Sequence, residues 1–198
     1  MLIVRYRATT CAIVAIVMLL VGAHVEADAQ LIDLERSTLT VHVFKAGLFS
    51  AFADNHVIRA SLVSGRITGE GTLTVELTVK AAQMTVLDPT LSADQRADVQ
   101  ARMHGPDVLD SARYPDIRFT STRIAPDGAD RWRVIGDLTL HGTSRPLTLV
   151  VVRRDGHFRG TVSIRQRDFG IRPISIAGGT VKVKDELQID FDIVDATR

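Results

Sequence analysis

Five histidines, His42, His56, His104, His141 and His157, are the side chains in the body of this chain best suited to metal binding or proton transfer. A metal-binding pair on one element needs a spacing of two residues on a strand or four on a helix. No two of these histidines have such a spacing. We therefore predict no metal site, with His141 and His157 at turns or strand ends and His104 in the last turn of a helix.

Two nearby carboxylates, Asp107 and Asp110, have the spacing of an acid–base pair. The segment around them is turn-like and ends at Pro115, so we interpret them as turn-capping residues. The sequence contains no Gly-x-Ser-x-Gly elbow, phosphate loop or dinucleotide-binding glycine motif. We predict no catalytic residues and expect a protein that is not an enzyme.

The elements that would position these residues are mostly strands. Residues 131–154 form two alternating apolar runs separated by a Gly- and Pro-containing turn, which predicts a β-hairpin. Residues 72–80 alternate most regularly, with one apolar face and one face of Thr, Glu and Lys. Further strands are expected at 38–45, 57–68, 117–124, 158–164 and 181–193. Together these runs predict an all-β antiparallel protein of eight strands.

One segment has helical signals. Ser92 is a candidate N-cap with Gln95 three residues later, which is a capping box. Gly105-Pro106 ends the helix, and Val99 and Met103 form a narrow apolar stripe. We therefore expect one short surface helix between Ser92 and His104.

Both a sandwich and a barrel fit this pattern, and single-face alternation in up-and-down order favours a closed, lipocalin-like barrel. Medium-sized aliphatic side chains would leave a lumen, and its nearly apolar lining predicts a long apolar ligand. His56 is the candidate for a polar contact at the barrel mouth, and an exposed loop histidine is the alternative. The side chains predicted to line the lumen are Val41, Val43, Phe49, Phe52, Val75, Leu77, Phe119, Trp132, Leu138, Leu149, Phe169 and Ile189.

The first 29 residues have the features of a secretory signal peptide. Arg5 and Arg7 precede an apolar run from 11 to 23, and Ala27-Asp28-Ala29 fits a signal-peptidase site. Cleavage there leaves a domain of residues 30–198 without cysteine, because the single cysteine is Cys11. That domain carries 22 basic and 21 acidic residues, so its charge gives no reason to expect nucleic acid. We predict a periplasmic or secreted location.

Three ordered motifs resemble the YceI-like family of exported polyisoprenoid-binding proteins. The first is Asp107-Val108-Leu109-Asp110-Ser111-Ala112-Arg113-Tyr114-Pro115 with 117–122 after it, the second is 136–142 with 146–149, and the third is Asp168-Phe169-Gly170-Ile171. The resemblance covers about residues 32–194. It implies a lipocalin-like barrel that holds an isoprenoid chain, typically of a quinone, in its lumen.

The resulting hypothesis is a periplasmic binding or carrier protein for an isoprenoid lipid such as an isoprenoid quinone, with no other cofactor. A transient membrane or respiratory partner and the oligomeric state are left open. An enzyme acting on such a lipid would need at least two polar groups converging in the lumen, and the predicted lining offers none. A stress-related structural or interaction module with a filled barrel is the main alternative. It differs in one observable, since a ligand pocket usually has a volume of at least several hundred Å³.

Overall fold

This computed structural model describes residues 30–46, 55–68, 73–176 and 181–196. The predicted signal peptide, residues 1–29, lies outside these ranges, as do the predicted lining residues Phe49 and Phe52. The elements are β1 (Gln30–Ala46), β2 (His56–Ala60), β3 (Leu62–Thr68), β4 (Thr74–Lys80), the 3-10 turn η2 (Ala81–Gln83), β5 (Thr85–Val86), α1 (Ala93–His104), β6 (Asp116–Pro126), β7 (Arg131–Leu140), β8 (Thr143–Arg154), β9 (His157–Arg165), the 3-10 turn η3 (Gln166–Phe169), β10 (Ser175–Ile176) and β11 (Val181–Asp195).

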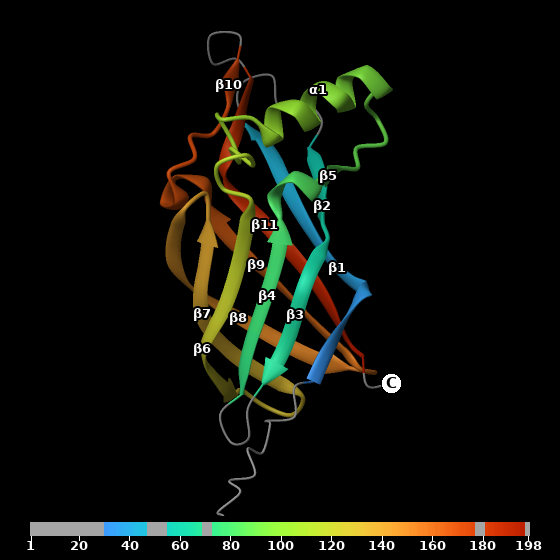
Figure 1. Cartoon of the computed structure of the whole chain (residues 1–198), viewed down its shortest axis with the longest axis vertical. Coiled ribbons are helices and arrows are strands. Elements are labelled where there is room, and N and C mark those ends of the chain that lie inside the picture. The colour runs from blue at the N-terminus through green and yellow to red at the C-terminus, as the bar shows by residue number, and fades with distance from the viewer. Residues whose placement is uncertain (1–29, 47–54, 69–72, 177–180, 197–198) are drawn as a thin grey trace, which may run out of the picture.

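The described strands form one antiparallel sheet. Its order is β10-β11-β9-β8-β7-β6-β4-β3-β1-β2-β5. Because β1 also pairs with β11, the sheet curls back on itself into a barrel-like wall (Figure 1). Neighbours around this wall follow one another nearly in chain order, as the up-and-down pattern of the sequence predicted. The all-β class with one short helix is confirmed.

The predicted count of eight strands is not confirmed, because the described sheet has eleven. The run 57–68, predicted as one strand, breaks at Ser61 into β2 and β3. Both β2 and β3 pair with β1 along one edge. Along the other edge, β2 pairs with β5 and β3 pairs with β4. The strands β5 and β10 have two residues each, which is too short for an alternating pattern to reveal them.

The hairpin predicted over residues 131–154 is formed by β7 and β8. The two strands pair without a register shift from Arg131 opposite Val152 to Leu140 opposite Thr143. The turn between them has positive φ at both His141 and Gly142, 51° and 71°, which is the backbone of the tight hairpin turns that match strand twist. On β7, Val134, Leu138 and Leu140 are buried, as expected for the inward face.

The core lies inside the curled sheet, and α1 lies across one end of it (Figure 1). Both bonds of the predicted capping box are present, between the Ser92 hydroxyl and the Gln95 amide N–H and between the Gln95 side chain and the Ser92 N–H. Met103, on the predicted apolar stripe, is buried. Among the described residues, no helix is long and apolar enough to cross a membrane.

Candidate functional site

Two cavities lie in line inside the curled sheet. The first, of about 530 Å³, lies at the end covered by α1, and the second, of about 360 Å³, lies toward the opposite end. Five side chains belong to both linings, so the two cavities adjoin there. We call these five the shared layer: Leu39, Leu77, Phe119, Leu138 and Ile189.

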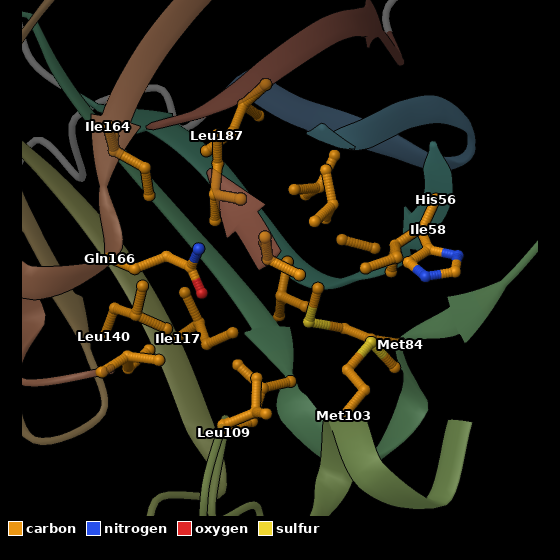
Figure 2. Close-up of a pocket in the computed structure, with 18 of the residues that line it drawn as sticks. His56, Ile58, Met84, Met103, Leu109, Ile117, Leu140, Ile164, Gln166 and Leu187 are labelled. Carbon is orange, nitrogen blue, oxygen red and sulfur yellow. The ribbon is translucent and has the colours of Figure 1, made fainter. Parts of the chain in front are cut away.

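The first cavity is apolar over most of its wall. Ile58 and Met84 approach it from one side, and Leu140 and Ile164 from the other, while Leu109 lies between them at the bottom of the view (Figure 2). Ile58, Leu140 and Ile164 lie on strands whose side chains alternate in and out, so their inward positions follow directly from the period of two. The thioethers of Met84 and Met103 are unbranched and can adapt to guests of irregular shape.

The helix α1 closes part of this cavity and is tied to the edge of the sheet. Val99 and Met103, the predicted apolar stripe, both line the cavity. The side chain of Gln100 accepts a hydrogen bond from the Val86 N–H at 2.7 Å and donates one to the Met84 carbonyl at 2.6 Å. The helix therefore covers part of the cavity, and the hydrogen bonds of Gln100 to β5 and the residue before it hold the helix in place.

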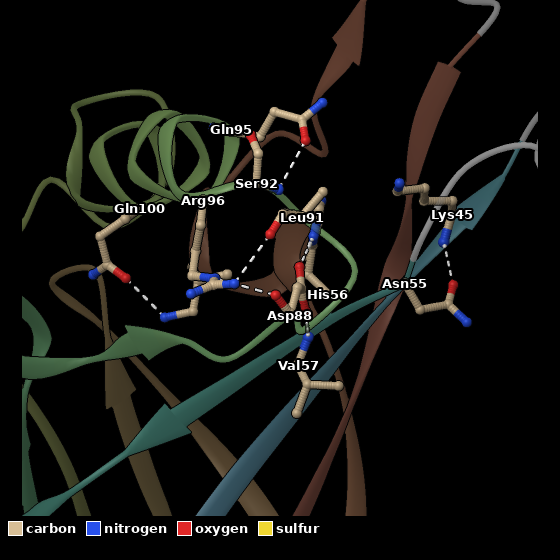
Figure 3. Close-up of polar contacts among 11 residues, drawn as sticks. Lys45, Asn55, His56, Val57, Asp88, Leu91, Ser92, Gln95, Arg96 and Gln100 are labelled. Carbon is tan, nitrogen blue, oxygen red and sulfur yellow. Dashed lines mark hydrogen bonds and ion pairs between the residues drawn. The ribbon is translucent and has the colours of Figure 1, made fainter.

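His56 lies in the lining of the first cavity and is held by a buried carboxylate. Its Nδ1 is hydrogen-bonded to Asp88, whose side chain is almost fully buried and also accepts a bond from the Val57 N–H at 2.7 Å (Figure 3). The Asp88 carbonyl accepts a further bond from Arg96 Nε at 3.1 Å. Asp88 thus connects β2 with α1. The sequence reasoning missed Asp88, although Asp-Pro directly after an apolar run is a signal for a capped turn.

Charged side chains stand at the open rim of the first cavity. The rim cations are Lys45, Arg102, Arg118 and Lys182, and the rim carboxylate is Asp98. Arg118 also pairs with Asp116, which lies beside Lys80. The hydrogen bond from Lys80, aided by the charges of Lys80 and Arg118, outweighs desolvation and holds the pKa of the Asp116 carboxyl below its ordinary value.

The structure brings most of the predicted lining residues to the two cavities. Val41 and Val43 line the first cavity, and Leu77, Phe119, Leu138 and Ile189 belong to the shared layer. Val75, Trp132 and Leu149 line the second cavity. Their contact with a ligand stays a prediction.

Phe169, also predicted as a lining residue, lies outside both cavity linings. This residue belongs to the turn η3 rather than to a strand, so strand parity does not apply to it. Its side chain is buried in the core but belongs to neither cavity lining. The sequence reasoning also missed Gln166, a buried polar residue in the wall of the first cavity.

The described ranges contain no group of three or more His, Cys, Asp or Glu residues arranged to hold a metal ion. The polar groups of the described residues at the first cavity are the His56–Asp88 pair, the amides of Gln166 and Gln95, and the rim charges. An apolar interior with a few polar groups suits the binding of an apolar molecule.

A curled antiparallel sheet around apolar cavities, with a helix across one end, defines an all-β, barrel-like class of protein. Within that class the chain matches the model of the YceI-like domain over residues 31–194. The chain therefore belongs to the YceI-like family.

Curated relatives and solved structures agree with this family. A UPF0312 protein of Pseudomonas savastanoi is 36% identical over an alignment of 76 residues that covers 33% of this chain and 40% of that protein. A UPF0312 protein of Vibrio cholerae is 28% identical over 124 residues, covering 57% of this chain and 64% of that protein. The matches thus span less than two thirds of the length of these relatives.

Two solved structures share the fold. BcnA of Burkholderia cenocepacia superposes with a TM-score of 0.65 at 20% identity, covering 83% of this chain and 99% of BcnA. A polyisoprenoid binding domain of Saccharophagus degradans, implicated in plant cell wall breakdown, gives a TM-score of 0.56 at 14% identity and covers 85% and 97% of the two chains. At these identities the likeness establishes the fold alone.

Proposed function

We propose that this protein binds a long apolar isoprenoid lipid, such as an isoprenoid quinone, and carries it within the two cavities. The observation that carries the proposal is the first cavity, whose volume of about 530 Å³ lies within the roughly 300–1,000 Å³ of small-molecule pockets. A chain that passed through the shared layer would occupy the second cavity as well. The solved relative described as a polyisoprenoid binding domain supports the same ligand class.

We further propose that the wall is an eight-stranded lipocalin-like barrel. Around the wall β1, β3, β4, β6, β7, β8, β9 and β11 follow one another, and β11 returns to β1. The strands β2, β5 and β10 are then additions near the α1 end. A barrel of this strand number has an interior that either fills with side chains or holds one small ligand.

A structural or stress-related module with a filled barrel is the competing function. A filled interior would leave no cavities of several hundred Å³, so the two cavities favour the binding protein. An enzymatic role would need a reactive group in the lumen beside a partner, and the described residues that line the cavity include no Ser, Thr or Cys that the His56–Asp88 pair could activate. We therefore propose binding without catalysis, in the periplasm or outside the cell after removal of residues 1–29.

The test uses the full chain expressed in a Gram-negative host. We expect the protein in the periplasmic fraction with Gln30 as its N-terminus, and lipid extraction followed by mass spectrometry should yield one isoprenoid lipid per protein. Recovery of an intact N-terminus in the membrane pellet would contradict the proposed export. Protein that is folded but free of lipid, and that takes up no added isoprenoid, would contradict the proposed binding.

A further inference from the structure

Gln166 is the one buried polar side chain among the described residues that line the first cavity. It is only 6% exposed and begins η3, directly after β9 ends. Its neighbours in the wall include Leu140, Ile164 and Leu187, all aliphatic (Figure 2). An amide in such surroundings is costly unless both of its ends find hydrogen-bond partners.

One end of the Gln166 amide has a partner. Its Nε2 donates a hydrogen bond to the Lys184 carbonyl on β11 at 2.8 Å. A backbone carbonyl can only accept, so the nitrogen of the amide must face Lys184 and the oxygen must face away. The contact with Lys184 therefore fixes which atom the amide presents to the cavity.

The other end has no partner in the described part of the chain. No described residue donates a hydrogen bond to Gln166 Oε1. Every fully enclosed side-chain nitrogen or oxygen atom of the described residues has a hydrogen-bond partner. Because Oε1 has no such partner among these residues, it is not fully enclosed and keeps some accessible surface. Since Gln166 is buried and lines the cavity, that surface faces the lumen, and Figure 2 shows the amide reaching into the pocket.

We propose that Gln166 Oε1 accepts a hydrogen bond from the head group of the bound lipid, so that the protein selects isoprenoid lipids with a hydroxyl donor. This inference rests on the proposed isoprenoid binding. A prenyl alcohol and the reduced, hydroquinone form of a prenyl quinone both carry such a hydroxyl. The carbonyl and ether oxygens of an oxidised quinone only accept hydrogen bonds. They could not bond to Gln166 Oε1, because that atom is an acceptor as well.

The selectivity follows from the apolar surroundings. A hydroxyl bound at Oε1 recovers the hydrogen bond that it gave up in water, whereas an acceptor-only head group leaves Oε1 unpaired. A single hydrogen bond of this kind corresponds to an affinity difference of about tenfold. The head group then lies in the first cavity, and the chain points through the shared layer toward the second.

Farnesol and farnesyl methyl ether test the proposal, because they share one chain and differ in the hydroxyl donor. Titration calorimetry with delipidated protein should give a dissociation constant about tenfold lower for farnesol. The ether carries one more methyl group, so apolar burial alone would favour the ether. A preference for farnesol thus reports on the hydrogen bond. A farnesylated hydroquinone and its dimethyl ether form a second pair that distinguishes a quinol ligand from an alcohol.

Gln166→Met removes the acceptor and keeps the side-chain length, and Gln83→Met makes the same change at an exposed residue outside both cavities. We expect the preference to disappear in Gln166→Met and to persist in Gln83→Met. If Gln166→Met does not fold, the ¹³C shift of the Gln166 side-chain carbonyl in the wild type should move with farnesol and not with the ether.

The outcomes separate the two proposals. Equal affinity for farnesol and its ether in the wild type, a preference that survives Gln166→Met, or an unmoved carbonyl shift would overturn the role of Gln166 and leave isoprenoid binding intact. Binding of neither compound, nor of a longer isoprenoid, would overturn isoprenoid binding itself.

Discussion

The ring of Tyr114 lies against Gly142 so closely that a Cβ on Gly142 would be 2.5 Å from Tyr114 Cε1. The same ring packs at a centroid distance of 4.5 Å against His141, whose Nδ1 donates a hydrogen bond to the Phe169 carbonyl at 3.3 Å. Three motifs that are far apart in the sequence therefore meet at one place. Leu109, Leu140 and Ile171, from the same three motifs, line the first cavity, so this cluster supports its wall.

Gly142→Ala should destabilise the protein strongly. The new Cβ would clash with the Tyr114 ring, and alanine is strained at a φ of 71°. Gly170→Ala is the matched control, because its φ is 75° but its Cβ would be 3.9 Å from the nearest neighbouring side-chain atom, His141 Nδ1. We expect about 1–2 kcal/mol of lost stability for the left-handed backbone alone and about 1–3 kcal/mol more for the clash in Gly142→Ala. Equal losses in urea unfolding would show that the Tyr114 contact is unimportant.

The regular elements could be predicted because they carry a local signal. The β7–β8 hairpin follows from apolar alternation and its turn residues, and α1 follows from the Ser92–Gln95 capping box. The break at Ser61 could not be predicted, because it reflects a change of neighbouring strand that no period within the segment encodes.

The predicted lining was most accurate where a residue lies within a long strand. Leu77, Leu138 and Ile189 reached the shared layer because strand parity determines which face they occupy. Gln166 and Phe169 follow the end of β9, where that parity stops, and Asp88 is buried by contacts from β2 and α1. Gln166 and Asp88 are polar residues buried by tertiary contacts, which carry no periodic signal, so both were missed.

Leu77→Asp should abolish lipid loading. Leu77 belongs to the shared layer, and an unpaired carboxylate there would be buried against aliphatic side chains at a cost of several kcal/mol. Thr78→Asp is the control, because Thr78 neighbours Leu77, lines neither cavity and pairs across the sheet with Arg118. Mass spectrometry of co-purified lipid and thermal unfolding measure both effects. Equal loss of lipid in the two variants would contradict the assigned faces of β4.

Asp88→Ala should loosen α1 over the first cavity. The change leaves the Val57 N–H and His56 Nδ1 without their acceptor, which costs about 1–3 kcal/mol for a buried donor. Amide hydrogen exchange in α1 should become faster, because the segment that leads into the helix loses its tie to β2. Asp94→Ala, at an exposed carboxylate in the first helical turn, should change exchange much less. Unchanged protection of α1 in Asp88→Ala would show that other contacts of the helix, such as those of Gln100, hold it in place.

Asp192 on the outer face of β11 should contribute to stability near neutral pH and lose that contribution in acid. Burial alone would raise its pKa, but hydrogen bonds from Arg159 and His157 outweigh burial and hold the pKa of Asp192 below its ordinary value. A carboxyl with a lower pKa in the folded state stabilises the fold above its unfolded pKa of about 3.9 and loses this effect as the pH falls toward the folded value.

The variant Asp192→Asn should therefore be less stable than the wild type at pH 7, and the difference should shrink by pH 3. Urea unfolding at the two pH values measures it, with Asp137→Asn, at an exposed carboxylate on β7, as the control. A difference that stays the same at both pH values would mean that the Asp192 charge does not contribute.

Trp132 should report the length of the bound chain. It lines the second cavity, where its ring packs at a centroid distance of 6.3 Å from Phe158, whereas Gln166 lines the first. With the head group in the first cavity, a quinone of one or two isoprene units should leave Trp132 emission nearly unchanged. Longer chains should cross the shared layer, exclude water from around the indole and shift its emission to shorter wavelength, with saturation at one equivalent.

Affinity should rise along the same series of prenyl quinones, because each buried methylene contributes about 0.8 kcal/mol until the cavities are full. The onset of this shift should therefore fall at a chain length where affinity is still rising. Leu77→Asp, which charges the shared layer, should remove the shift caused by long chains. Strong quenching by a one-unit quinone would instead place the quinone ring, which is the quencher, beside Trp132 in the second cavity and reverse the proposed orientation of the lipid.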